Sequence, residues 1–171
     1  MWYRFLCTLL SFGMLACHSI NNQNESVDFE ISTSPCFGEC PILDAKLHDN
    51  SIYFNLIKYN NVKGLYIYKL KKNEREAIKN LITQIAIDSL KDRSTTFIPD
   101  VQYMNSILSY KKKKKEILFI KSQAPISYQK FVNYILKFKD SSLVKIDTTI
   151  NFMTRKKVPI LEMGIPPMPN N

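Results

Sequence analysis

Hydrophobic and polar residues alternate along much of the chain between residues 27 and 70, with the period of two that is typical of half-buried strands. Val27, Phe29 and Ile31 alternate with polar residues until Pro35 ends the first run. The polar trio 49–51 predicts a hairpin turn, because Asn tolerates a left-handed backbone. The close spacing of the runs predicts an antiparallel meander. Its four strands are expected at 27–32, 42–48, 52–59 and 65–70.

The hydrophobic period changes to that of a helix after residue 72. Apolar residues between Ala77 and Ile85 fall on one helical face, and Asn73 and Glu76 have the spacing of a capping box. Residues 91–100 lack periodicity and are expected to form a loop. Further elements are then predicted as a hairpin of strands 102–110 and 116–121, a helix near 127–138 and a last strand at 144–153.

The order of these elements groups the strands instead of alternating each strand with a helix. Such grouping favours the α+β class, in which helices cover one side of an antiparallel sheet. We therefore predict an antiparallel sheet built from a β-meander, a helix, a hairpin and a second helix, with both helices packed on one face.

The N-terminal segment has the pattern of a bacterial lipoprotein signal. Arg4 supplies a positive charge, and Phe5–Ala16 is apolar over about a dozen residues, the length of a signal-peptide core. This run is shorter than the roughly 20 residues that a membrane span needs. Cys17 follows the small residue Ala16 and is the predicted site of lipidation. The alternative is an ordinary secretory signal, with Cys17 an incidental thiol.

These patterns predict a signal peptide at 1–16, a flexible tether at 17–26, a single α+β domain at 27–153 and a Pro-rich C-terminal tail at 154–171. Removal of 16 of the 171 residues leaves 155, which suits one domain with a sizeable core. No Asp follows Cys17 as an inner-membrane retention signal. We therefore expect a lipid-anchored protein of the cell envelope, in the outer membrane and facing the periplasm.

The chain is basic, with a formal net charge of +9 that falls to +8 when Arg4 is removed with the signal. Five consecutive lysines are expected to form a solvated hairpin tip, with contact to an anionic membrane surface as the alternative. Nucleic-acid binding is not expected, because the run lacks interleaved arginines and aromatic residues. The five residues are Lys111, Lys112, Lys113, Lys114 and Lys115.

Cys36 and Cys40 would be the two thiols left in the domain after lipidation of Cys17. An even pair in an oxidising compartment predicts a disulfide, and Gly38 between them permits a tight bend. The alternative is a soft-metal site, since two thiolates and the imidazole of His48 could bind copper(I). No other metal site is expected.

The run Ile31–Leu70 resembles the start of an uncharacterised domain family of Bacteroidota envelope lipoproteins. The family shares a Pro-Cys-Phe-Gly-x-Cys-Pro opening, matched here by Pro35–Pro41, and a later Gly-x-Tyr strand, matched by Gly64 and Tyr66. The usual Asp-Gly turn is Asp49-Asn50 here. The resemblance covers roughly residues 27–140. It implies the anchor, the disulfide and a single domain, and it carries no activity.

No catalytic constellation is recognisable in the sequence. The glycines after the signal are Gly38, Gly64 and Gly164, so no phosphate-binding glycine loop is present, and no Gly-x-Ser-x-Gly occurs. We expect no enzyme activity and no cofactor. The chain is predicted to be a lipid-anchored binding domain whose partner is an envelope protein or a glycan. The alternative is an envelope redox or copper-handling protein that uses Cys36 and Cys40.

Overall fold

The computed structural model describes residues 26–92, 98 and 100–157 of the chain. The predicted signal peptide, Cys17, the tether up to residue 25 and the tail beyond residue 157 lie outside the described residues.

The described residues form one seven-stranded antiparallel sheet with two α-helices, which confirms the α+β class. The strand order is β6-β5-β1-β2-β3-β4-β7, so the predicted meander continues from β1 to β4 and the later hairpin pairs with the outer side of β1. The strands are β1 (Asp28–Thr33), β2 (Ile42–His48), β3 (Ser51–Lys58), β4 (Gly64–Lys69), β5 (Tyr103–Tyr110), β6 (Lys113–Ile120) and β7 (Val144–Lys145).

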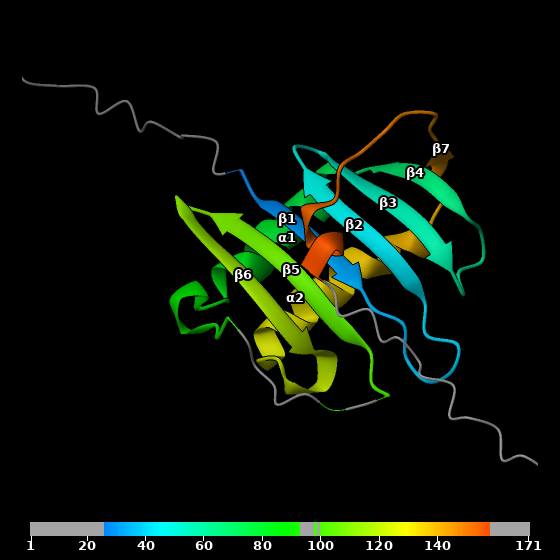
Figure 1. The fold of residues 1–171 in the computed structure, drawn as a ribbon. Helices are drawn as coiled ribbons and strands as arrows, with labels where there is room; N and C mark the ends of the chain where they lie inside the picture. The colour runs from blue at the N-terminus through cyan, green and yellow to red at the C-terminus, as the bar shows by residue number, and fades with distance from the viewer. Residues whose placement is uncertain (1–25, 93–97, 99, 158–171) are drawn as a thin grey trace, which may run out of the picture.

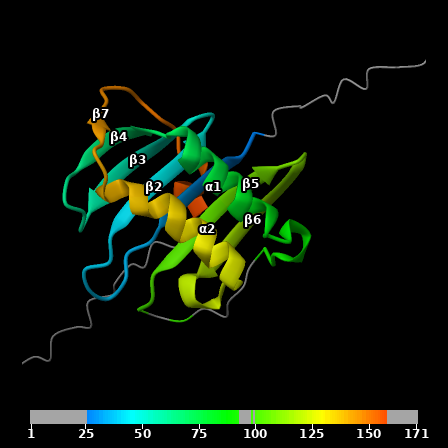
Figure 2. The ribbon, with the colours of Figure 1, turned by 180° about the vertical axis from the view of Figure 1, so that it is seen from behind.

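Both α-helices lie on the same side of the sheet, behind it in Figure 1 and in front of it in Figure 2. They are α1 (Lys72–Thr83) and α2 (Ile126–Leu136). The predicted capping box of Asn73 and Glu76 is wrong by two residues. The N-cap is Lys71, and its backbone N–H donates to the carboxylate of Glu74 (2.7 Å). Four short 3₁₀ turns complete the described elements: Ile87–Ser89, Lys121–Gln123, Lys137–Asp140 and Met153–Lys157 (η4).

Aromatic side chains fill the space between the sheet and α2. Phe131 of α2 meets Phe29 of β1 edge-on, with ring centroids 4.9 Å apart, and Tyr128 meets Phe119 of β6 at 5.4 Å. The Tyr128 hydroxyl is fully buried and shares a hydrogen bond of 2.6 Å with Ser106, so burial raises the pKa of Tyr128 without leaving its hydroxyl unpaired. This apolar layer is the main core.

The C-terminal part of the domain differs from the prediction. A strand was expected at 144–153, but β7 contains two residues, which pair with Tyr66 and Ile67 at the edge of the sheet. The chain then crosses to the face opposite the helices, where Phe152 and Thr154 are buried. The folded part therefore extends through η4, beyond the predicted boundary at residue 153. The prolines that suggested a tail begin at Pro159 and do not bear on residues 154–157.

The lysine run also differs from the prediction. The turn between β5 and β6 consists of Lys111 and Lys112, both with positive φ (50° and 63°), as a two-residue hairpin turn requires. Lys113, Lys114 and Lys115 belong to β6 and are not part of the tip. Five identical polar residues hide the alternation that would have marked the start of this strand.

The face of the sheet opposite the helices has a buried polar centre. Glu30 and Ser32 point there because they alternate with Phe29 and Ile31 along β1. Thr154 of η4 donates from its backbone N–H to Glu30 Oε1 (2.8 Å), and its hydroxyl lies 2.7 Å from the Ser32 hydroxyl. In Figure 1 this orange-red segment lies in front of the sheet, across β1 and β5. η4 therefore covers the middle of the second face.

Asp44 of β2 and Arg155 of η4 form the central ion pair of this layer. The Asp44 side chain is only 2% exposed, and its Oδ1 accepts hydrogen bonds from Arg155 Nε (2.7 Å) and Ser32 Oγ (2.6 Å), while Oδ2 accepts one from Asn55 (2.9 Å). The other guanidinium nitrogens donate to the carbonyl oxygens of Thr33 and Leu43, both at 2.8 Å. The buried charge is thus fully hydrogen-bonded.

A second ion pair fixes the end of η4. Lys157 Nζ donates to Glu116 Oε2 of β6 at 2.7 Å. This contact, which is the largest influence on the carboxyl, holds the pKa of Glu116 below its usual value. η4 is therefore fastened to β1, β2 and β6.

We predict that Arg155→Ala lowers the free energy of unfolding by about 2–4 kcal/mol, because the Asp44 carboxylate would remain buried without its cation. Urea unfolding followed by circular dichroism measures this change. Lys156→Ala is the matched control, since Lys156 is exposed, and it should change the stability by less than about 0.5 kcal/mol. Equal and small effects of both substitutions would show that η4 does not stabilise the sheet.

Candidate functional site

The direction of the strands places two groups of connections at opposite ends of the sheet. The N-terminal end carries Ser26, the start of β1, the β2–β3 turn, the passage from β4 to α1 and the β5–β6 turn. The disulfide end carries the β1–β2 connection at 34–41, the β3–β4 loop at 59–63 and the segment before β5. In Figure 1 the two ends lie at the upper left and the lower right of the sheet.

Cys36 and Cys40 are joined in a disulfide at the disulfide end, with their Cα atoms 5.8 Å apart. The predicted pairing is therefore present. Gly38 has φ 125°, in the region that favours glycine, and a Cβ placed there would meet no atom within 4 Å. The ring is a tight surface loop whose tip is open to solvent.

Hydrogen bonds fix the base of the disulfide ring to the sheet. Gln102 Nε2 donates to the carbonyl oxygens of Ser34 (3.0 Å) and Pro41 (2.9 Å), one on each side of the ring. The Thr33 hydroxyl also donates to the Pro41 carbonyl at 2.8 Å. The ring is thus held in place at both of its ends, and its tip has a defined position.

Phe37, at the tip of the ring, has the largest exposed fraction among the exposed large hydrophobic side chains of the described residues, at 78%. Aromatic side chains of this size normally bury most of their surface. Further exposed apolar side chains lie in or next to the connections at the same end. They are Ile57, Tyr59, Val62, Ile98 and Ile126. The disulfide end therefore exposes several apolar side chains, and Phe37 is at the tip of its disulfide ring.

His48 does not lie near the cysteines. It is the last residue of β2, whereas Cys40 precedes the first, so about 20 Å of strand separates them. Its Nδ1 lies 2.7 Å from Asp28 Oδ1 at the N-terminal end. Within the part of the chain that is described, no three His, Cys, Asp or Glu side chains form a group that could hold a metal. The structure therefore does not bring His48 together with Cys36 and Cys40, because the length of β2 lies between them.

The lysine run lies at the N-terminal end of the sheet. Lys113 forms an ion pair with Asp88, and Lys115 forms one with Asp92 at 2.5 Å. Lys111 Nζ lies 5.3 Å from the centre of the Tyr110 ring. Contact between this run and a membrane surface remains a prediction.

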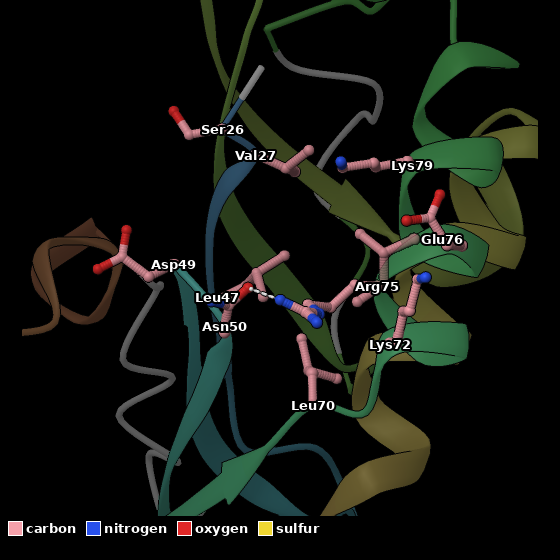
Figure 3. Close-up of a pocket in the computed structure, with 11 residues that line it drawn as sticks. Ser26, Val27, Leu47, Asp49, Asn50, Leu70, Lys72, Arg75, Glu76 and Lys79 are labelled. Atoms are coloured by element: carbon pink, nitrogen blue, oxygen red, sulfur yellow. Dashed lines mark hydrogen bonds between the residues drawn. The ribbon is translucent and has the colours of Figure 1, made fainter. Parts of the chain in front are cut away.

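A pocket of about 480 Å³ opens at the N-terminal end and was not foreseen from the sequence. Figure 3 shows it between the start of β1, the β2–β3 turn and α1. Three cationic side chains of α1 border it: Lys72, Arg75 and Lys79. Their i, i+3, i+7 spacing is a usable sequence signal, but the walls come from segments about 20 to 50 residues apart, which no local pattern brings together.

None of the helices within the described residues is long and apolar enough to cross a membrane. Cys17 lies outside the described residues, so its lipidation remains a prediction.

Comparison with known proteins identifies a family for the domain. Residues 27–139 match a family profile described as "Domain of unknown function (DUF6438)", and this match spans 113 of the 171 residues. The match agrees with the predicted membership in an uncharacterised family. No curated protein matches the chain.

We predict that the double substitution Cys36→Ser, Cys40→Ser lowers the free energy of unfolding by about 2 kcal/mol and leaves the fold intact, because such a short ring restricts the unfolded chain only slightly. Denaturant unfolding of the variant, with the reduced native protein as control, measures the change. The variant and the reduced native protein should have equal free energies of unfolding. Loss of the folded state, or free thiols at these positions in the unreduced protein, would contradict this prediction.

Proposed function

Since the chain belongs to the DUF6438 family, whose function is unknown, we propose its function from its geometry. The protein is a lipid-anchored, non-catalytic binding domain of the cell envelope that presents its disulfide end to a protein partner. The observation that carries this proposal is the exposure of Phe37 on a ring that is closed by a disulfide and fastened to the sheet.

A rigid, exposed aromatic side chain has the properties of an interface anchor. Residues that dominate binding energy are commonly large aromatic side chains that enter a pocket of the partner. The ring fixes Phe37 before binding, so little conformational entropy would be lost in the complex. The disulfide thus serves to prepare the loop for binding more than to stabilise the domain.

The surroundings of Phe37 favour a protein partner over a glycan. Ile57, Val62 and Ile126 expose aliphatic surface at the same end of the sheet, and such surface finds its complement in an apolar protein pocket. We therefore infer that the partner is another envelope protein with an apolar recess.

The placement of the two ends determines how the domain would stand on the proposed lipid anchor. Ser26, the first described residue, lies at the N-terminal end, so a tether from Cys17 would join the domain on the side opposite Phe37. A tether of about nine residues has a reach of roughly 15–18 Å. The domain would then stand with its disulfide end turned away from the membrane, and we propose the periplasmic face of the outer membrane as its position.

We do not retain the redox or copper-handling alternative. The disulfide ring leads into a strand, whereas thiols of low pKa in redox proteins commonly lie at a helix N-terminus. The histidine required for the copper site lies at the other end of β2.

We predict that a photoreactive phenylalanine analogue at position 37 forms a discrete protein adduct in intact cells, because Phe37 would lie in the interface. The same analogue at Val144, which is exposed at the β7 edge, is the matched control and should form none. Phe37→Ala should remove the same protein from a pull-down without changing the stability of the domain. Adduct formation at both positions alike, or retention on envelope polysaccharide without a protein adduct, would contradict the proposed protein partner.

We also predict that Cys17→Ser abolishes incorporation of labelled fatty acid and releases the protein from the membrane fraction, because two or three acyl chains would be lost. Metabolic labelling and fractionation of the envelope measure this outcome. Cys7 lies within the predicted signal peptide, so Cys7→Ser is the control that should keep the label. Persistence of the label in the Cys17 variant would overturn the anchor.

A further inference from the structure

The pocket at the N-terminal end combines an apolar floor with a cationic rim. Its apolar floor consists of Val27 just before β1, Leu47 of β2, Leu70 between β4 and α1, and Ile78 of α1. Figure 3 shows Lys72, Arg75 and Lys79 projecting from α1 along one side of the opening. A site that is apolar inside and positively charged at its rim suits an anionic amphiphile.

One N–H of the Arg75 guanidinium has no acceptor among the described residues. Its Nη1 donates to Asn50 Oδ1 of the β2–β3 turn at 2.8 Å, which draws the side chain across the pocket, as Figure 3 shows. Its Nε is buried and makes no hydrogen bond to the described residues. A buried N–H without an acceptor carries a free-energy penalty, and a phosphate oxygen is an acceptor that matches the guanidinium edge.

The acidic side chains at the pocket do not cancel this charge. Glu76 lies between the cations on α1, and Asp49 lies on the opposite wall, so the three cations exceed the two carboxylates. The neighbouring β5–β6 turn adds Lys111 and Lys112 at the same end of the sheet. Positive charges therefore exceed negative charges among these side chains, at the end of the sheet that the proposed tether would hold next to the membrane.

We propose that this pocket binds the phosphate-bearing head group of an anionic membrane lipid. The phosphate would lie against Arg75, Lys72 and Lys79, and the glycerol and upper acyl carbons would contact the apolar floor. The inference rests on the proposed function, which places Ser26 and Val27 beside the membrane. Bound in this way, the domain would stand upright on its tether with Phe37 directed outward.

The test uses vesicles and the chain from His18 onward, exported through an ordinary signal peptide, which keeps every described residue but lacks the lipid anchor. It should bind vesicles that contain phosphatidylglycerol and not vesicles of phosphatidylcholine alone. Lys72→Glu with Lys79→Glu should weaken this binding by about 30-fold or more, since each cation near an anionic surface contributes about 1 kcal/mol.

The matched control is Lys58→Glu with Lys121→Glu, which makes the same change of net charge at the disulfide end. This variant should bind the anionic vesicles nearly as well as the native chain. Arg75→Gln, which retains a donor for Asn50, should weaken binding without lowering the melting temperature. An equal loss of vesicle binding in both double-lysine variants would show that anionic vesicles attract a basic protein in general. That result would overturn the pocket as the binding site.

A second arm separates the lipid from a free phosphate. Titration with glycerol 1-phosphate and with inorganic phosphate, followed by calorimetry, should show much weaker binding than to the vesicles. Binding of either soluble anion as tight as that of the vesicles would overturn the lipid as occupant. The protein used in this test lacks Cys17. Failure to bind vesicles would therefore overturn the lipid pocket without bearing on the lipid anchor or the Phe37 interface. Conversely, failure of either of those two proposals would not change the vesicle result.

Discussion

The ion pair between Asp44 and Arg155 joins two segments 111 residues apart and settles how the second face of the sheet is covered. The helices bury one face with apolar side chains, but the opposite face has polar residues at its centre. An isolated carboxylate at Asp44 would carry a large desolvation penalty. Arg155, Ser32 and Asn55 offset it together, and Thr154 brings the neighbouring Glu30 into the same layer. The central strands are thereby held between two ordered layers, and both ends of the sheet take their positions from these strands.

The elements that could be predicted from the sequence are those marked by a pattern of neighbouring residues. Hydrophobic and polar residues alternate most clearly in β1 and β2, and Cys36 and Cys40 are near enough in sequence to define their own ring. The buried polar layer could not be predicted, because Glu30, Ser32 and Asp44 stand at positions that normally face water in a half-buried strand. That face is buried only because η4, which follows about 120 residues after β1, packs on it.

The separation of the two ends follows from strand length and direction. A strand of seven residues divides His48 from Cys40, and the same strands divide the cationic pocket from Phe37. The proposed membrane contact and the proposed protein contact would therefore lie at opposite ends of the sheet and would not obstruct each other. The disulfide ring and the pocket are therefore formed by different residues at opposite ends of the sheet.

The position of Lys113, Lys114 and Lys115 in β6 has a consequence for crowding. β6 is the outermost strand on one side of the sheet, and an outer strand offers unpaired backbone groups to which another sheet could add. The backbone N–H of Leu118 is already bonded to the Asp92 carbonyl oxygen at 2.9 Å. Lys113 and Lys115 are paired with Asp88 and Asp92, and lysines on an edge strand disfavour the addition of another strand. On the other side, β7 is too short to serve as a template. Copies concentrated on a two-dimensional surface would thus be protected from edge-to-edge aggregation.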